Sequence, residues 1–167
     1  VISGQPVSEP EIPLVVPTVS DELPIHIEAK DGCPRYLGRI IRNVNLNSES
    51  PLWMQEKLRR SGLRSIDPVV DVTNFVLIEL GQPMHAFDYS KLEGHINVRM
   101  ANENEKLVLL DGKEVILSSE IMLITDSKKP VAMAGIMGGL ATSVTESTKD
   151  VFLECAFFEP VTIAGKA

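Results

Sequence analysis

Hydrophobic residues gather in several short runs that are typical of β-strands, and the first of these runs alternates with polar residues. These runs cover residues 24–28, 35–46, 121–125, 130–135 and 151–158. Asp111-Gly112 lies between two further apolar runs and predicts an antiparallel hairpin over residues 106–117. Helix signals cluster before residue 81 and strand signals after it. The sequence therefore predicts an α+β fold of antiparallel sheets and hairpins with a few packed helices.

Residues 51–61 carry both the start and the stop signals of a helix. Ser50 can cap this helix, Pro51 suits its first position and Gly62 can end it. Because these signals agree, we expect a helix over residues 51–61 with its cap at Ser50.

Residues 69–80 are apolar on nearly every side, which predicts a helix buried in the core. An Asp-Pro pair at 67–68 offers its start, whereas the many β-branched residues leave a strand as the alternative. Gly81 can supply the left-handed conformation that ends a helix, and Pro83 prevents its continuation. His85 is therefore expected on a rigid corner.

Composition and charge limit the class of protein. The chain has 167 residues, of which 44% are hydrophobic, enough for one substantial core. Its formal net charge of -7 argues against a sequence-independent nucleic-acid binder, which needs clustered Lys and Arg; a nucleic-acid end contacted at few phosphates stays allowed. Cys33 and Cys155 lack metal-like spacing and indicate neither a disulfide framework nor a zinc site, which fits a reducing cytosol. No run approaches the roughly 18 apolar residues of a membrane span.

The ends of the chain suggest how it is divided. Residues 1–23 are rich in proline and have few periodic runs, which predicts a linker or arm before one domain over residues 24–167. The opening VISGQPVSEPEIP lacks the basic start and apolar core of a signal peptide. The chain has no initiator methionine and stops abruptly at IAGKA, so we expect a fragment of something larger.

Several polar residues near the corner are candidates for chemistry. Asp71, Thr73 and Asn74 lie among apolar neighbours and need hydrogen-bond partners once buried. Neighbouring backbone groups are one possible partner, and a ligand is the other. His85 and Asp88 could form an oriented histidine, or His85 could satisfy a nearby backbone group as a structural residue.

Two further places lie in the second half. The glycines of AGIMGG, residues 134–139, fit either a tight turn or a main-chain cradle for an anion or carbonyl. Glu154 lies within the apolar run VFLECAFF, where a carboxylate is paired, faces solvent, or is held ready for a polar ligand group. No nucleophile elbow, HExxH motif or metal triad is present. The residues alone indicate a small-ligand pocket near positions 73, 85, 138 and 154.

Three long stretches are more specific than any single motif: PLWMQEKLRRSGLRSIDPVVDVTNFVLIELGQPMHAFDYSKL, AMAGIMGG and FLECAFFEP. Together they resemble the B3/B4 editing region of the bacterial phenylalanyl-tRNA synthetase β subunit, over roughly residues 24–167. The resemblance implies a B3/B4-like domain, truncated at its C-terminal end because the family continues into a helical stretch after FEPVTIAGKA. In that family the domain hydrolyses tyrosine attached in error to phenylalanine tRNA, and the α subunit activates phenylalanine with ATP.

The resemblance also implies roles for particular residues. His85, Thr73 and Asn74 would form the catalytic group near the terminal adenosine and the ester, and Glu154 would meet the tyrosine hydroxyl. The remaining residues implied in substrate binding are Gly135, Gly138, Pro83 and Arg64.

Partners and cofactors follow from the same resemblance. It implies a cytoplasmic protein that does not bind a membrane. Its expected partners are the 3′ end of tRNA-Phe, tyrosine as the non-cognate amino acid, and the synthetase α subunit in an α2β2 heterotetramer. It implies no cofactor and no metal for the editing domain, since ATP and Mg serve the full synthetase. A non-catalytic module that holds the subunit or the tRNA end is the alternative.

Overall fold

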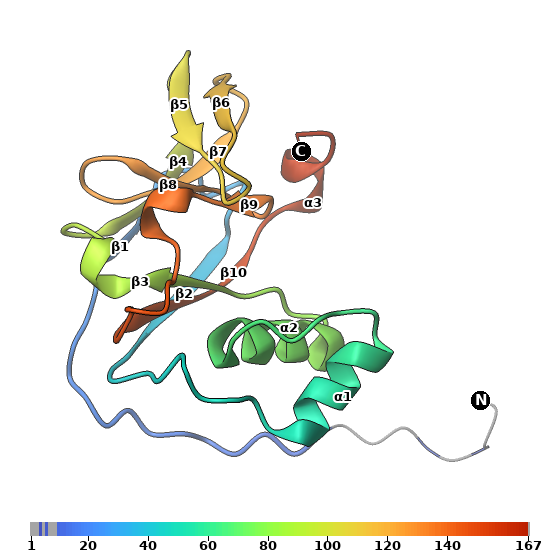
Figure 1. Ribbon diagram of the computed structural model, residues 1–167. Helices are drawn as coiled ribbons and strands as arrows, with labels where there is room; N and C mark the ends of the chain where they lie inside the picture. Colours follow the sequence, from blue (N-terminus) through green and yellow to red (C-terminus); the bar gives the residue numbers. More distant parts are fainter. Residues whose placement is uncertain (1–3, 5, 7–9, 167) are drawn as a thin grey trace.

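The computed structural model describes Gly4, Pro6 and residues 10–166. It has an α+β fold, as predicted, with strands in three sheets (Figure 1). In the five-stranded sheet all pairs are antiparallel except the parallel pair of β1 and β4. The strands of this sheet, in spatial order, are β1 (Ile25–Ile27), β4 (Ile96–Met100), β7 (Met122–Thr125), β8 (Pro130–Met133) and β9 (Met137–Gly138).

The second sheet has three antiparallel strands. Its central strand is β10 (Val151–Phe157), which lies between β2 (Arg35–Ile41) and β3 (His85–Asp88). The strand predicted over residues 35–46 therefore forms but ends at residue 41.

The hairpin predicted over residues 106–117 is confirmed. It consists of β5 (Glu105–Val108) and β6 (Glu114–Leu117), and Gly112 adopts a φ of 83° in its turn. Figure 1 shows the hairpin projecting from the top of the molecule.

Helices flank the sheets. In the described part of the chain none is long and apolar enough to cross a membrane. Figure 1 shows the two longer ones side by side at the end of the molecule opposite the hairpin. The helical elements are α1 (Leu52–Arg60), α2 (Pro68–Leu80), the short α3 (Pro160–Ile163), and the 3-10 turns η1 (Tyr89–Lys91) and η2 (Leu140–Thr142).

The two larger sheets share one apolar core. Side chains two apart on a strand point to the same face, so Phe152 and Glu154 of β10 point the same way. Phe152 is 1% exposed within the core, and a carboxyl group therefore accompanies it into apolar surroundings. The other large buried members of this core are Tyr36, Ile40, Phe87, Ile96, Val98, Met122, Ile124 and Val131.

The helix predicted over residues 51–61 is confirmed as α1, but the predicted cap is wrong. Pro51 occupies the N-cap position, and no side chain caps the helix. The Ser50 hydroxyl donates instead to Asp71 Oδ2, at 2.6 Å. Leu52 and Trp53 at the start of α1 are 80% and 54% exposed, so water can satisfy their free N–H groups, whereas the buried Asp71 depends on protein donors.

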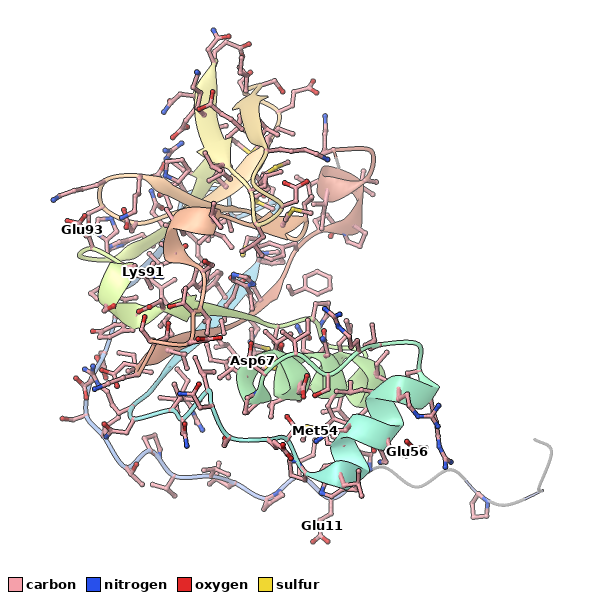
Figure 2. All side chains as sticks on the ribbon, in the orientation of Figure 1. Glu11, Met54, Glu56, Asp67, Lys91 and Glu93 are labelled. Carbon is pink, nitrogen blue, oxygen red and sulfur yellow. The ribbon has the colours of Figure 1, made fainter. Side chains whose placement is uncertain are left out.

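The second helix is confirmed as α2, and the strand alternative is wrong. Asp67 accepts from two N–H groups of the first turn, and Gly81 ends the helix with a φ of 70° (Figure 2 labels Asp67). The prediction that this helix is buried in the core is wrong, because Val72 and Ile78 are 42% and 51% exposed. One side of α2 packs against α1 and β3, and its other side faces solvent.

Residues 10–24 form neither helix nor strand. Leu23 packs against the core, and Asp21 forms an ion pair with Arg42. Residues 1–3, 5 and 7–9 of the predicted arm lie outside the described part of the chain. The division between an arm at 1–23 and a domain at 24–167 stays a prediction.

Asp71 ties α2 to the segment before it. Its side chain is fully buried and accepts hydrogen bonds from the hydroxyls of Ser50 and Ser65 and from the N–H of Ile66. Burial alone would raise the pKa of Asp71, but these three donors outweigh burial and lower it. The three hydrogen bonds to Asp71 thus hold α2 against the segment before it.

We expect Asp71→Ala to destabilise the chain by about 2 to 4 kcal/mol, because it removes the acceptor of three hydrogen bonds, one of them from the buried Ser50 hydroxyl. Urea unfolding followed by circular dichroism measures this loss. Asp111→Ala, in the exposed hairpin turn, is the control and should cost under about 1 kcal/mol. Equal losses in the two variants would contradict a structural role for the Asp71 contact.

Candidate functional site

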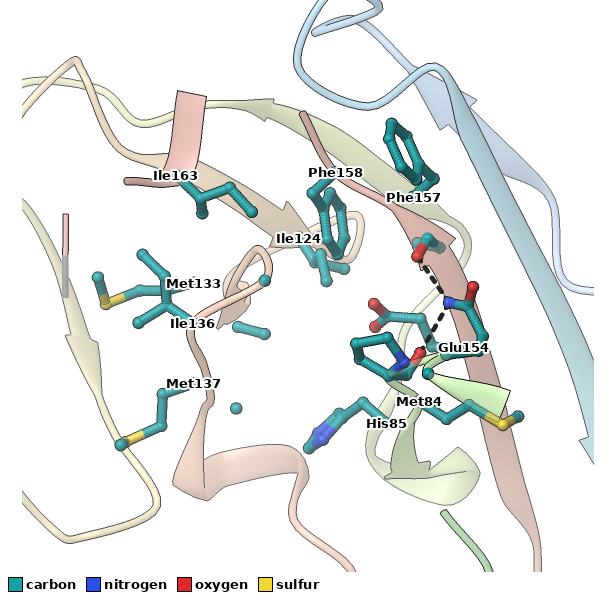
Figure 3. Close-up of a pocket in the computed structure, with 17 residues that line it drawn as sticks. Met84, His85, Ile124, Met133, Ile136, Met137, Glu154, Phe157, Phe158 and Ile163 are labelled. Carbon is teal, nitrogen blue, oxygen red and sulfur yellow. Dashed lines mark hydrogen bonds between the residues drawn. The ribbon is translucent and has the colours of Figure 1, made fainter. Parts of the chain in front are cut away.

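A cavity of about 490 Å³ opens between the start of β3, the end of β10 and the turn that joins β8 to β9 (Figure 3). Five of the residues predicted at the site line it, and they come from segments far apart in sequence: Pro83, His85, Gly135, Gly138 and Glu154. Most of the remaining wall is apolar and includes Ile124, Met133, Ile136, Met137, Phe158 and Ile163.

Strand register places the two titratable side chains next to each other. β3 pairs with β10 so that His85 lies directly opposite Glu154, and directly opposed side chains share one face. The predicted rigid corner leads into this pair. Gln82 fixes this corner, because its Nε2 donates to the carbonyl of Pro83 at 3.0 Å and to that of Ala156 at 3.1 Å.

His85 contributes a nitrogen without a protein partner. Nε2 is enclosed and makes no hydrogen bond, while the ring packs edge-on against Phe87 at a centroid distance of 4.5 Å. Burial lowers the pKa of His85 to about 4, so the ring is neutral near pH 7. The proposed pairing with Asp88 is wrong, because that carboxylate accepts from Ser90 and Thr148 instead.

Glu154 contributes a buried carboxyl group. It is 5% exposed, so the alternative in which it faces solvent is wrong. Burial raises the pKa of Glu154 to about 8, and the hydroxyl of Tyr36, which donates to Oε2 at 3.3 Å, opposes that rise. Figure 3 shows the carboxyl group directed into the cavity. Near pH 7 the group is largely protonated.

The two glycines shape the cavity in different ways. A Cβ on Gly138 would lie 2.6 Å from Cε1 and 2.8 Å from Nε2 of His85, so the ring packs directly on the glycine main chain. Gly135 has a φ of 69° within the tight turn from Met133 to Met137, where the N–H of Ile136 donates to the carbonyl of Met133. The tight turn is present, and the group that lies against the Gly138 main chain is the His85 ring, so the main-chain cradle for an anion or carbonyl stays a prediction.

Three predicted residues do not line the cavity: Thr73, Asn74 and Arg64. The Thr73 hydroxyl donates to the carbonyl of Val70 at 2.9 Å, which is the backbone alternative considered for it. Asn74 is half-buried on α2, and Arg64 is exposed between α1 and α2. Their implied contacts with a nucleotide stay predictions.

Sequence reasoning missed Tyr36 and Gln82. Tyr36 contacts a residue 118 positions away, and no local signal points to that contact. Gln82 lies inside the predicted corner, where a side chain between a helix end and a strand start could have been considered as a tether. Among the described residues, no group of three His, Cys, Asp or Glu side chains is arranged to hold a metal ion.

Known proteins resemble this chain along its whole length. The model of the B3/4 domain family matches residues 32–167. Phenylalanine–tRNA ligase beta subunits of Photorhabdus laumondii and Colwellia psychrerythraea are 58% and 59% identical over 167 residues, which is 100% of this chain. The match covers 21% of each relative, so the chain spans about a fifth of their length.

A solved structure shares the fold. It is an N-terminal fragment of the phenylalanyl-tRNA synthetase beta-subunit from Pyrococcus horikoshii, with a TM-score of 0.62 and 17% identity over 85% of this chain and 45% of that one. At this identity the likeness concerns the fold alone.

We expect stability of the 167-residue chain to fall between pH 6.5 and pH 8 and Glu154→Gln to remove most of that fall. The pKa of Glu154 is about 8 in the folded chain, above its ordinary value of 4.5, so the folded chain keeps a proton that the unfolded chain has released. Stability therefore decreases as pH rises through this window, by about 1 to 2 kcal/mol. His85, with a lowered pKa of about 4, acts below pH 6.5 in the opposite sense, as the unfolded chain takes up its proton.

Urea unfolding at pH 6.5, 7.2 and 8.0 measures the difference. Glu146→Gln, an exposed glutamate, is the control and should keep the wild-type slope. Parallel curves for wild type and Glu154→Gln would show that Glu154 is ionised throughout.

We expect Gly138→Ala to destabilise the chain by about 1 to 3 kcal/mol, because the added methyl overlaps the His85 ring. In a His85→Ala background the ring is absent, so the same substitution should cost under about 1 kcal/mol. Urea unfolding of the four chains in this double-mutant cycle gives the coupling free energy. If the free-energy changes of the two substitutions are additive, the strain does not come from contact between the added methyl and the His85 ring.

Proposed function

The chain belongs to the B3/4 domain family, and from this premise we propose that it is the editing domain of a phenylalanine–tRNA ligase beta subunit. In this proposal it hydrolyses the ester of tyrosine mischarged onto tRNA-Phe. The observation that carries the proposal is the pair of His85 and Glu154 at one apolar cavity.

The buried carboxyl group supports selection for tyrosine. Tyrosine and phenylalanine differ by one hydroxyl. An apolar pocket that selects the amino acid for attachment to tRNA rejects this extra hydroxyl only weakly. A second pocket that hydrogen-bonds this hydroxyl rejects phenylalanine, because the buried polar group of the pocket would stay unpaired. Glu154 fits this role, since it is buried and forms no ion pair among the described residues.

His85 fits a role at the ester. Water attacks the ester carbonyl carbon, the bond from that carbon to the ribose oxygen breaks, and free tyrosine and the tRNA hydroxyl are released. A neutral ring can hydrogen-bond the attacking water or the ester, and the unpartnered Nε2 can do so once its contact with Gly138 opens. With a pKa of about 4 it is a weak base, so we assign it positioning of the water or ester rather than full proton transfer. Main-chain N–H groups of the glycine turn would support the oxyanion.

The partners belong to the same proposal. They are the 3′ end of tRNA-Phe, tyrosine, and the ligase alpha subunit in an α2β2 assembly in the cytoplasm. Editing itself would need no cofactor, whereas the full synthetase uses ATP and Mg. Thr73, Asn74 and Arg64 would contact the adenosine side, beyond the cavity that holds the amino acid.

We expect Glu154→Ala and His85→Ala to fail differently in the intact ligase. Glu154→Ala should slow Tyr-tRNA hydrolysis about ten- to a hundredfold and leave Phe-tRNA hydrolysis equal or faster, because only tyrosine loses a hydrogen bond. His85→Ala should slow both substrates through the shared ester. Deacylation assays with both charged tRNAs measure these rates.

Glu146→Ala serves as the surface control and should leave both rates unchanged. An unchanged tyrosine-to-phenylalanine ratio in Glu154→Ala would reject the recognition role of Glu154. No hydrolysis of either ester by the wild-type ligase would reject editing and favour a module that only holds the tRNA end.

A further inference from the structure

Tyr36 contacts the carboxyl group of Glu154 from the core, behind the wall of the cavity. It lies on β2 opposite Ala156 of β10, so it is the diagonal neighbour of Glu154 on the same sheet face. Its side chain is buried, 6% exposed, in the core between the two larger sheets. Its hydroxyl donates to Oε2 of Glu154 at 3.3 Å, the only side-chain hydrogen bond that Glu154 makes among the described residues.

We propose that Tyr36 is the positioning residue of Glu154: its hydroxyl occupies Oε2 and leaves Oε1 as the carboxyl oxygen that meets a ligand in the cavity. This inference rests on the proposed function and deepens it, because it names the residue that orients the group selecting tyrosine over phenylalanine. Tyr36 itself does not line the cavity and acts through Glu154.

The chemistry of the pair determines which hydrogen bond the ligand receives. The pKa of Tyr36 is well above its ordinary value, chiefly through burial and then through Glu154, so the phenol stays a donor at every physiological pH. A neutral carboxyl that accepts at Oε2 carries its proton on Oε1. Glu154 therefore presents an O–H donor to the phenolic oxygen of a bound tyrosine side chain. Once ionised, it presents Oε1 as an acceptor for the phenolic O–H.

The surroundings of Glu154 contain few competing charges. The titratable groups around it are His85 on β3, Tyr36 on β2, Cys155 beside it on β10, and Cys33 just before β2. Burial raises the pKa of both cysteines, so neither is ionised near pH 7. Within the described ranges no lysine or arginine pairs with Glu154. Tyr36 is thus the protein group best placed to orient the carboxyl.

The first test is a titration of Glu154 that does not depend on any enzymatic activity. Carbon-13 NMR of glutamate side chains in the 167-residue chain reports the pKa of Glu154 directly. Tyr36→Phe removes the donor and keeps the ring in the core. It should raise the pKa of Glu154 by about half a unit, a threefold shift in its protonation equilibrium, because a 3.3 Å contact is longer than a typical O–H···O bond.

Tyr89→Phe is the matched control, because Tyr89 is the other of the two tyrosines and makes no hydrogen bond to Glu154. It should leave the pKa of Glu154 unchanged. A backbone spectrum of each variant confirms that the fold is kept. An unchanged pKa in a folded Tyr36→Phe chain would overturn the proposal.

The second test measures discrimination in the intact ligase. Tyr36→Phe should lower the ratio of Tyr-tRNA to Phe-tRNA hydrolysis about threefold, through Tyr-tRNA alone, and should raise the pH at which that ratio changes. Equal slowing of both substrates, or a ratio and pH profile like those of Tyr89→Phe, would overturn the positioning role.

The two tests separate this inference from the proposed function. A wild-type ligase that hydrolyses neither ester would reject editing, and the titration would still decide whether Tyr36 orients Glu154. If the ligase edits but the pKa of Glu154 is the same in wild type and Tyr36→Phe, the proposed editing function stands and the positioning role of Tyr36 is rejected.

Discussion

The antiparallel pairing of β10 between β2 and β3 is the constraint on which the site depends. Because side chains alternate along β10, the face that buries Phe152 also carries Glu154, and no local rearrangement can turn one outward without the other. The same register brings His85 of β3 and Tyr36 of β2 beside this carboxyl. The apolar packing that stabilises the two sheets therefore also desolvates the two titratable groups at the cavity.

Desolvation shifts the pKa values of the two groups in opposite directions but has one consequence for their charge. It raises the pKa of Glu154 and lowers that of His85, so both side chains are mainly uncharged near pH 7. A cavity with two neutral polar groups and apolar walls suits a ligand with an aromatic ring and one hydroxyl better than a charged side chain. The formal net charge of -7 counts Glu154 as ionised, and the other charged residues of the described chain lie outside this cavity.

Local signals predicted the elements well, whereas contacts between distant residues decided the site. The hairpin at Asp111-Gly112 and the end of α2 at Gly81 depend on turn chemistry within a few residues, and both form as expected. The cap at Ser50 failed because Asp71, 21 residues later, takes its hydroxyl. For Glu154, alternation shows which side chains share a face, and both faces of that strand are apolar in sequence. Only the packing of the two sheets decides which face is buried.

Polar contacts near both ends of α2 fix the corner that leads to His85. At the start of α2, Asp71 binds the segment before the helix, although much of the outer side of α2 is apolar and exposed. After its end, Gln82 joins the corner to the last part of β10 through two carbonyls. Two polar anchors thus fix a helix that apolar burial holds on one side only. Because β3 begins immediately after this corner, a loss of either anchor would shift His85 relative to Glu154 before it unfolded the sheets, since the sheets have a core of their own.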